Sequence, residues 1–176
     1  MFWFNIIYKI IKVFKGGATP GQISAGLTLG VILGLTPGWP AHMLALLLIV
    51  LILNVNLTLF LVGIALGKVV GWALDPAFDA LGGYALLNID SLKGLYTAMY
   101  NSPFWMLTRF NNTLVMGGFV AALLFSLPLY FLFRILATLI QSRLIPKFQD
   151  SKIAKAIKKS WLFGIYSKID AVGSTL

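Results

Sequence analysis

Few residues of this sequence could do chemistry, and the clearest candidate is a lysine inside an apolar run. Lys68 lies within residues 57–74, and Asp75 follows seven residues later, on the same face of a helix with 3.6 residues per turn. A charge inside an apolar membrane segment is costly and by default indicates a functional site. The alternative is structural, because the lysine stem can extend to lipid headgroups or the amine can pair with Asp75.

The other ionisable candidates are weaker. His42 is the single histidine of a chain without cysteine or glutamate, so it has few partners for a metal site. Its role is either proton relay or that of a polar interfacial residue near the start of a helix. Asp75 and Asp79 are four residues apart, but Pro76 lies between them and one shared helix face is not assured. We find no nucleophile–base pair, phosphate loop or metal cluster. We therefore expect no enzyme, no cofactor and no metal, with Lys68, Asp75 and His42 as the candidate substrate or proton site.

The composition indicates that lipid surrounds these residues. Of 176 residues, 59% are hydrophobic and only 11% charged, and the mean hydropathy is +0.90. A soluble domain is nearer half apolar and a quarter charged. The sequence therefore predicts an all-α integral membrane protein.

The basic residues are concentrated at the two ends of the chain. Most of the 14 lysines and arginines lie before residue 16 or after residue 133, whereas residues 75–103 hold three Asp and one Lys. Basic flanks stay in the cytoplasm, so we expect both termini there, an even number of crossings and a multi-pass protein. Such flanks suit the anionic lipids of the inner leaflet and argue against a nucleic-acid partner.

Both ends have the pattern of amphipathic helices that lie on a membrane surface. Residues 1–16 place lysines on one helical face and aromatic and aliphatic side chains on the other, and residues 142–176 form a second basic amphipathic tail. Between them, residues 17–141 are the predicted membrane domain, with an outer interfacial segment at 75–112. The lysines expected at lipid headgroups are Lys9, Lys12, Lys15, Lys152, Lys155, Lys158 and Lys159.

Two glycine ladders are the sharpest pattern. Glycines recur every fourth residue in the first apolar run and again in the third, and each ladder is followed by a proline, Pro37 or Pro76. Glycines four apart form a groove in which another helix backbone can approach closely. The sequence therefore predicts helix packing, within the chain or against a partner, by Gly26, Gly30, Gly34, Gly63, Gly67 and Gly71.

A helix-breaking segment follows the first ladder. Its residues Thr36, Pro37, Gly38 and Pro40 separate two apolar runs, at 23–35 and 41–53. Each run is shorter than the roughly 20 residues that a helix needs to cross the hydrocarbon core. The two runs form either a re-entrant hairpin or two short crossings, and the chain then has two or four full spans. The later run at 113–140 predicts a transmembrane helix, and the polar residues before it, Arg109, Asn111 and Asn112, are expected to form a structural cap.

These motifs resemble a family of small bacterial inner-membrane proteins known only as the domain-of-unknown-function 2062-like family. The resemblance rests on Thr19-Pro20, on the run from Gly30 to Pro37, and on Asn54-Val55-Asn56 followed by Gly63. It covers about residues 19–75. It implies a location in the bacterial inner membrane, and the family has no established activity to carry over.

Two functions fit the pattern. The first is a non-enzymatic assembly or accessory subunit that packs with a protein partner, or with a second copy of the chain, through the glycine ladders. The second is a small transporter or lipid-handling protein with a broken-helix site near Pro37 and Lys68.

Overall fold

The structure, a computed structural model, describes Phe14, residues 17–38 and residues 40–146. The chain divides into two compact units, one of residues 17–137 and one that includes Phe14 and residues 138–146. The described residues are helical and contain no strand, as the sequence predicts. Most of the two amphipathic ends, with all seven of their predicted headgroup lysines, lies outside the described residues.

The first described helix, α2 (Pro20–Leu35), begins directly after its N-cap residue Thr19. The Thr19 hydroxyl accepts a hydrogen bond from the Gln22 backbone, and the Gln22 side chain accepts one from the Thr19 N–H at 2.9 Å. This reciprocal pair satisfies two amide groups that the first turn would leave unpaired. The helix ends where Thr36 turns to an extended backbone before Pro37.

Two further helices follow the break. Helix α3 (His42–Ile52) begins two residues after Pro40, and helix α4 (Leu57–Leu87) begins after Asn56. The Asn56 side chain accepts a hydrogen bond from the Leu59 N–H at 3.0 Å, so it caps α4 as asparagine commonly does.

Helix α4 is longer than the sequence predicts. We expected the third run to end at Asp75-Pro76, but the helix continues through Pro76 to Leu87. A proline in a helix removes one backbone hydrogen bond. Here the turns after it bury Phe78, Gly82 and Ala85, and this packing favours a continuous helix over a break.

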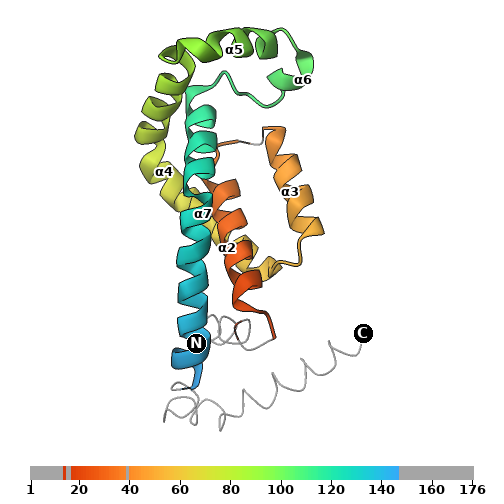
Figure 1. Ribbon diagram of the computed structural model, residues 1–176, viewed down its shortest axis with the longest axis vertical. Coiled ribbons are helices and arrows are strands. Elements are labelled where there is room, and N and C mark those ends of the chain that lie inside the picture. Colours follow the sequence, from red (N-terminus) through yellow and green to blue (C-terminus); the bar gives the residue numbers. More distant parts are fainter. Residues whose placement is uncertain (1–13, 15–16, 39, 147–176) are drawn as a thin grey trace. The chain divides into compact units, whose positions relative to one another are not determined.

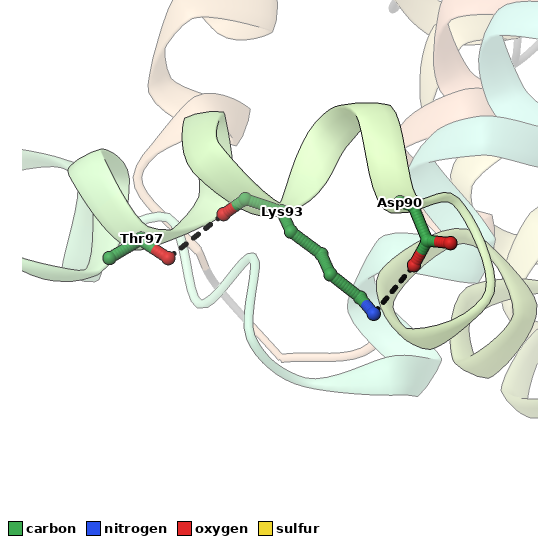
Figure 2. Close-up of polar contacts among 3 residues, drawn as sticks. All are labelled: Asp90, Lys93 and Thr97. Carbon is green, nitrogen blue, oxygen red and sulfur yellow. Dashed lines mark hydrogen bonds and ion pairs between the residues drawn. The ribbon is translucent and has the colours of Figure 1, made fainter.

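A group of short helices joins α4 to the last long helix: η1 (Asp90–Leu92), α5 (Lys93–Tyr100) and α6 (Pro103–Met106). Figure 1 shows α5 running from the end of α4 across the end of α7, with α6 farther along, above α3 in this view. We call residues 88–112 the cap segment. Figure 2 shows its start, where Lys93 pairs with Asp90 at 2.6 Å and the Thr97 hydroxyl donates to the Lys93 carbonyl. The ion pair is exposed and contributes little stability.

Helix α7 (Thr113–Leu139) leads into the π-helix η2 (Ile140–Leu144). The Asn112 side chain accepts a hydrogen bond from the Val115 N–H at 3.0 Å, so one of the three polar residues expected to cap the helix does so. In the other unit, Gln141 donates to the Phe14 carbonyl at 3.0 Å. The helices over Leu57–Leu87 and Thr113–Arg143 are long and apolar enough to cross a membrane, which is compatible with a membrane protein.

Helices α2 and α4 form the centre of residues 17–137. On one side, Met43 and Val50 of α3 pack against Leu33 and Phe60. On the other, Ala121 of α7 packs with apolar side chains of both central helices. The α2–α4 pair therefore holds the helix break in place.

Candidate functional site

The two glycine ladders face each other across the α2–α4 contact. A Cβ atom built on Gly63 would lie 2.5 Å from the Leu27 carbonyl oxygen, and one on Gly34 would lie 2.5 Å from the Ile64 carbonyl oxygen. Gly30 and Gly67 meet the facing backbone in the same way. Real side chains do not tolerate such distances, so the two backbones touch because these positions lack a Cβ.

The contacts also give the direction and the relative depth of the two helices. The Asn56 N–H donates to the Gln22 carbonyl at 3.1 Å, near the start of both helices. Gly71 lies against Leu35 at the end of α2. Helices α2 and α4 are therefore parallel, and α2 ends beside the middle of α4.

Lys68 of α4 forms a hydrogen bond with the helix break after α2. The Lys68 Nζ donates a hydrogen bond to the Thr36 carbonyl oxygen at 2.8 Å. This carbonyl lies at the C-terminal end of α2, where carbonyl groups lack helical partners and a positive charge is favourable. The structure thus joins two of the predicted site residues, but the partner of Lys68 is a backbone oxygen rather than the Asp75 carboxylate.

The cap segment covers the same break. The Ala41 N–H donates to the Leu107 carbonyl at 2.9 Å, and the Arg109 guanidinium lies 3.5 Å from where a Cβ on Gly38 would stand. Gly38 has φ +71°, which glycine adopts freely, whereas Arg109 has φ +53°, which is uncommon for a residue with a side chain. Arg109 was not among the residues predicted for the site, and its backbone conformation is visible only in the fold.

His42 lies at the start of α3, under the cap segment. Its ring makes an edge-to-face contact with Phe119 of α7, with centroids 5.4 Å apart. The backbone of Thr108 is a polar neighbour of the ring. The buried Nε2 atom nevertheless has no hydrogen-bond partner among the described residues.

The two aspartates of α4, Asp75 and Asp79, are not the partners of Lys68. Asp79 accepts a hydrogen bond from the Thr113 hydroxyl and so joins α4 to the first turn of α7. Asp75 is half-buried and makes no ion pair with the other described residues. The part of the chain that the structure describes contains no group of three metal-ligating side chains.

A second glycine contact, which was not predicted from the sequence, joins α4 to α7. A Cβ on Gly82 would overlap the Thr113 backbone and come 2.7 Å from the Gly117 nitrogen, and a Cβ on Gly117 would overlap the Phe78 carbonyl. Each helix contributes one glycine rather than a ladder, so the spacing gave no strong signal. The adjacent pairs Gly82-Gly83 and Gly117-Gly118 are the pattern that could have indicated it.

The comparison with known proteins decides the family. The model of a family described as "Uncharacterized protein conserved in bacteria (DUF2062)" matches residues 5–144. The chain belongs to the DUF2062 family. This DUF2062 protein is also similar to an uncharacterized protein of Treponema pallidum (strain Nichols), at 29% identity over 147 residues that cover 84% of this chain and 90% of the relative. No solved structure matches the DUF2062 chain.

The match confirms the family that the resemblance predicted. It extends from residue 5 to residue 144 and so contains the α2–α4 contact, the break and the cap segment. The family description names no activity for DUF2062 proteins. The functional argument therefore depends on the geometry.

Proposed function

We propose that this protein is a non-enzymatic accessory or assembly subunit of the bacterial inner membrane that binds another membrane protein or a second copy of itself. The observation that carries the proposal is the contact between α2 and α4. Backbone atoms fill the space between the two ladders, and the Lys68 amine already donates a hydrogen bond to the Thr36 carbonyl. A substrate path would instead need space and free polar groups at this depth.

The surface for a partner lies on the opposite face of α4. The two ladders face each other, so a partner cannot bind to them without separating α2 from α4. Leu61, Ala65, Val69 and Trp72 are exposed and recur at three- or four-residue spacing along α4, which places them on one helix face. Ala65 lies in the middle of this face, where a small residue permits close approach.

The depth of the break supports four crossings rather than a re-entrant hairpin. Gly71, which lies beside the end of α2, is 14 residues after Leu57, and at 1.5 Å per residue this is about 21 Å along the helix. The hydrocarbon core is about 30 Å thick. If α4 enters the hydrocarbon core at Leu57, the end of α2 therefore lies beyond the bilayer midplane. It lies level with Gly71, which is four residues before Asp75 on α4. Four crossings, like two, place both basic termini on the cytoplasmic side, so the charge distribution fits either number.

Site-specific photocrosslinking in cells tests the subunit proposal. A photoreactive residue at Val69 should yield a discrete adduct with a protein partner or with a second copy of the chain. The same residue at Leu124 is the matched control, because Leu124 is 62% exposed on α7 and Val69 is 68% exposed on α4. Lipid adducts alone at Val69, together with a monomer in mild detergent, would exclude a subunit role.

One observation favours the second function, a transporter or lipid-handling protein. Helix α2 has 16 residues and α3 has 11, lengths of about 24 Å and 17 Å. Both are shorter than the hydrocarbon core, and short spans thin the bilayer locally. A thinned bilayer beside Lys68 would ease the movement of an anionic headgroup.

Lipid movement in reconstituted vesicles tests this second function. Lys68→Ala should lower the rate of lipid scrambling several-fold, whereas Arg143→Ala, which changes an exposed arginine of η2, should leave the rate unchanged. If lipid scrambling is equally fast with either variant and in protein-free vesicles, a lipid-handling function is excluded. Gly30→Leu is less informative, because its side chain would meet the α4 backbone.

A further inference from the structure

A groove lies where the cap segment meets the end of α4 and the start of α7. It is open and has a volume of about 490 Å³, within the range of roughly 300–1,000 Å³ that is typical of small-molecule sites. Four of its residues are three or four apart along α5, so they share one face of that helix. They are Lys93, Tyr96, Thr97 and Tyr100. We call this surface the α5 groove.

Aromatic packing fixes the more buried part of the α5 groove. The Tyr96 hydroxyl donates to the Ala85 carbonyl at 3.3 Å, and the Tyr96 ring stacks on Phe110 with centroids 6.2 Å apart. Phe110 is itself buried. These contacts hold α5 against the end of α4, so the groove is formed without a ligand.

Three side chains of the α5 groove can still donate hydrogen bonds. Tyr100 is 60% exposed, and neither its hydroxyl nor the Asn111 side-chain amide forms a hydrogen bond with the rest of the described chain. The Lys93 ammonium has three donors, and its partner is the exposed Asp90 carboxylate, 2.6 Å away (Figure 2). Phosphate oxygens are strong acceptors for such groups.

The charges around the α5 groove are of both signs. Lys93 is the one charged side chain among the described residues that line it. Its amine pairs with Asp90, and Asp79 accepts a hydrogen bond from Thr113, which also lines the groove. One amine beside two carboxylates does not favour an anionic ligand. A zwitterion matches it, because the exposed ion pair contributes little and can open to bind both charges.

The α5 groove lies at the level of lipid headgroups. From Leu114 to Phe133, 20 residues of α7 carry no charge, and at 1.5 Å per residue they span about 30 Å, the thickness of the hydrocarbon core. Thr113, directly before them, therefore lies at the surface of that core. Leu86 and Leu87 form an apolar wall beside it. A phosphate that carries acyl chains fits these walls better than a soluble one.

We propose that the α5 groove binds a zwitterionic phospholipid whose headgroup carries a primary ammonium. The phosphate accepts a hydrogen bond from Lys93, and the ammonium donates to Asp90. Tyr100 and Asn111 donate to the phosphate or ester oxygens, and the acyl chains begin at the two leucines of α4. The site is separate from the proposed partner face on α4. It depends on the membrane location and not on whether the chain acts as a subunit.

Native mass spectrometry of the protein in detergent tests the lipid preference. Phosphatidylethanolamine and phosphatidylglycerol with the same acyl chains, added in equal amounts, give adducts of different mass. We expect the ethanolamine lipid to be retained several-fold more often, and equal retention would overturn the proposal. Glycerophosphoethanolamine, which lacks acyl chains, should not displace the lipid at the same concentration. Displacement would overturn a lipid as the occupant.

Two variants locate the binding in the α5 groove. Lys93→Gln should lower the retention of phosphatidylethanolamine several-fold, and Asp90→Asn should remove its preference over phosphatidylglycerol because the ammonium loses its acceptor. Both residues are exposed, so the variants should fold, which circular dichroism checks. Arg109→Gln is the matched control, because Arg109 is an exposed cation of the cap segment outside the groove. Unchanged retention in Lys93→Gln, an unchanged preference in Asp90→Asn, or a lost preference in Arg109→Gln would overturn the proposal.

Discussion

Lys68 donates a hydrogen bond from Nζ to the backbone carbonyl oxygen of Thr36, 2.8 Å away and 32 residues earlier in the chain. The bond places a positive charge at the C-terminal end of α2, directly before Pro37. Because proline cannot continue the helix, the carbonyls of the last turn need partners from elsewhere. Lys68 therefore joins the third apolar run to the break that follows the first.

The first prediction concerns this bond. Lys68→Met retains the apolar stem but removes the donor, so it should lower the free energy of unfolding by about 1.5–3 kcal/mol, the range for a hydrogen bond made by a charged group. Unfolding in an SDS titration measures the change. Lys68→Arg retains a charged donor and should recover most of the loss. Equal stability of Lys68→Met and the unchanged protein would mean that the bond contributes nothing.

The second prediction concerns the sign of the stability change caused by glycine-to-alanine substitutions. Gly30→Ala places a methyl group against the Phe60 and Gly63 backbone, so it should cost about 3 kcal/mol or more. Gly94→Ala in α5 meets nothing within 4 Å and should stabilise the protein by up to about 1 kcal/mol, as expected for alanine in a helix. Thermal unfolding in detergent compares the two. A stabilising effect of Gly30→Ala would contradict the close contact of α2 and α4.

Much of the helix pattern could be predicted from the sequence because it depends on local chemistry. Thr19-Pro20 and Asn112 are helix caps, and a cap requires only neighbouring residues. The break at residues 36–40 has the same local origin, because two prolines and a glycine cannot continue a helix. These features are therefore readable without the fold.

The features that could not be predicted from the sequence depend on contacts between distant segments. Pro76 has the local chemistry of a helix end, yet α4 continues because Phe78 and Gly82 are buried by later parts of the chain. The partner of Lys68 is a backbone carbonyl, and such an acceptor has no signature in the sequence. The α5 groove needs the end of α4, α5 and the start of α7 together, so no single segment of the sequence indicates it.

The third prediction compares two adjacent glycines of α7. A Cβ on Gly117 would overlap the Phe78 carbonyl of α4, whereas a Cβ on Gly118 would lie 3.5 Å from the Leu35 carbonyl, an ordinary contact. Gly117→Ala should therefore separate α4 from α7 and lower the unfolding midpoint strongly, while Gly118→Ala should change it little. Differential scanning fluorimetry measures both variants. Similar midpoints would show that α4 and α7 do not meet at Gly117.

The last prediction concerns the depth of the helix break. The chain has no cysteine, so single cysteines can report accessibility without background. If α2 and α3 are two short crossings, Gly38→Cys in intact cells should react with a membrane-impermeant maleimide, as should Asp90→Cys in the cap segment. Asn54→Cys, between α3 and α4, should react only after the membrane is permeabilised.

The controls for this experiment follow from the local structure. Asp90 is 87% exposed and its ion pair with Lys93 contributes little, so Asp90→Cys should fold. Gly38 has φ +71°, and a side chain there costs about 1–2 kcal/mol, so Gly38→Ala first checks that the strain is tolerated. Reaction at Asp90→Cys with protection of a folded Gly38→Cys would favour the re-entrant hairpin. The break would then lie within the membrane, and the chain would have two full spans instead of four.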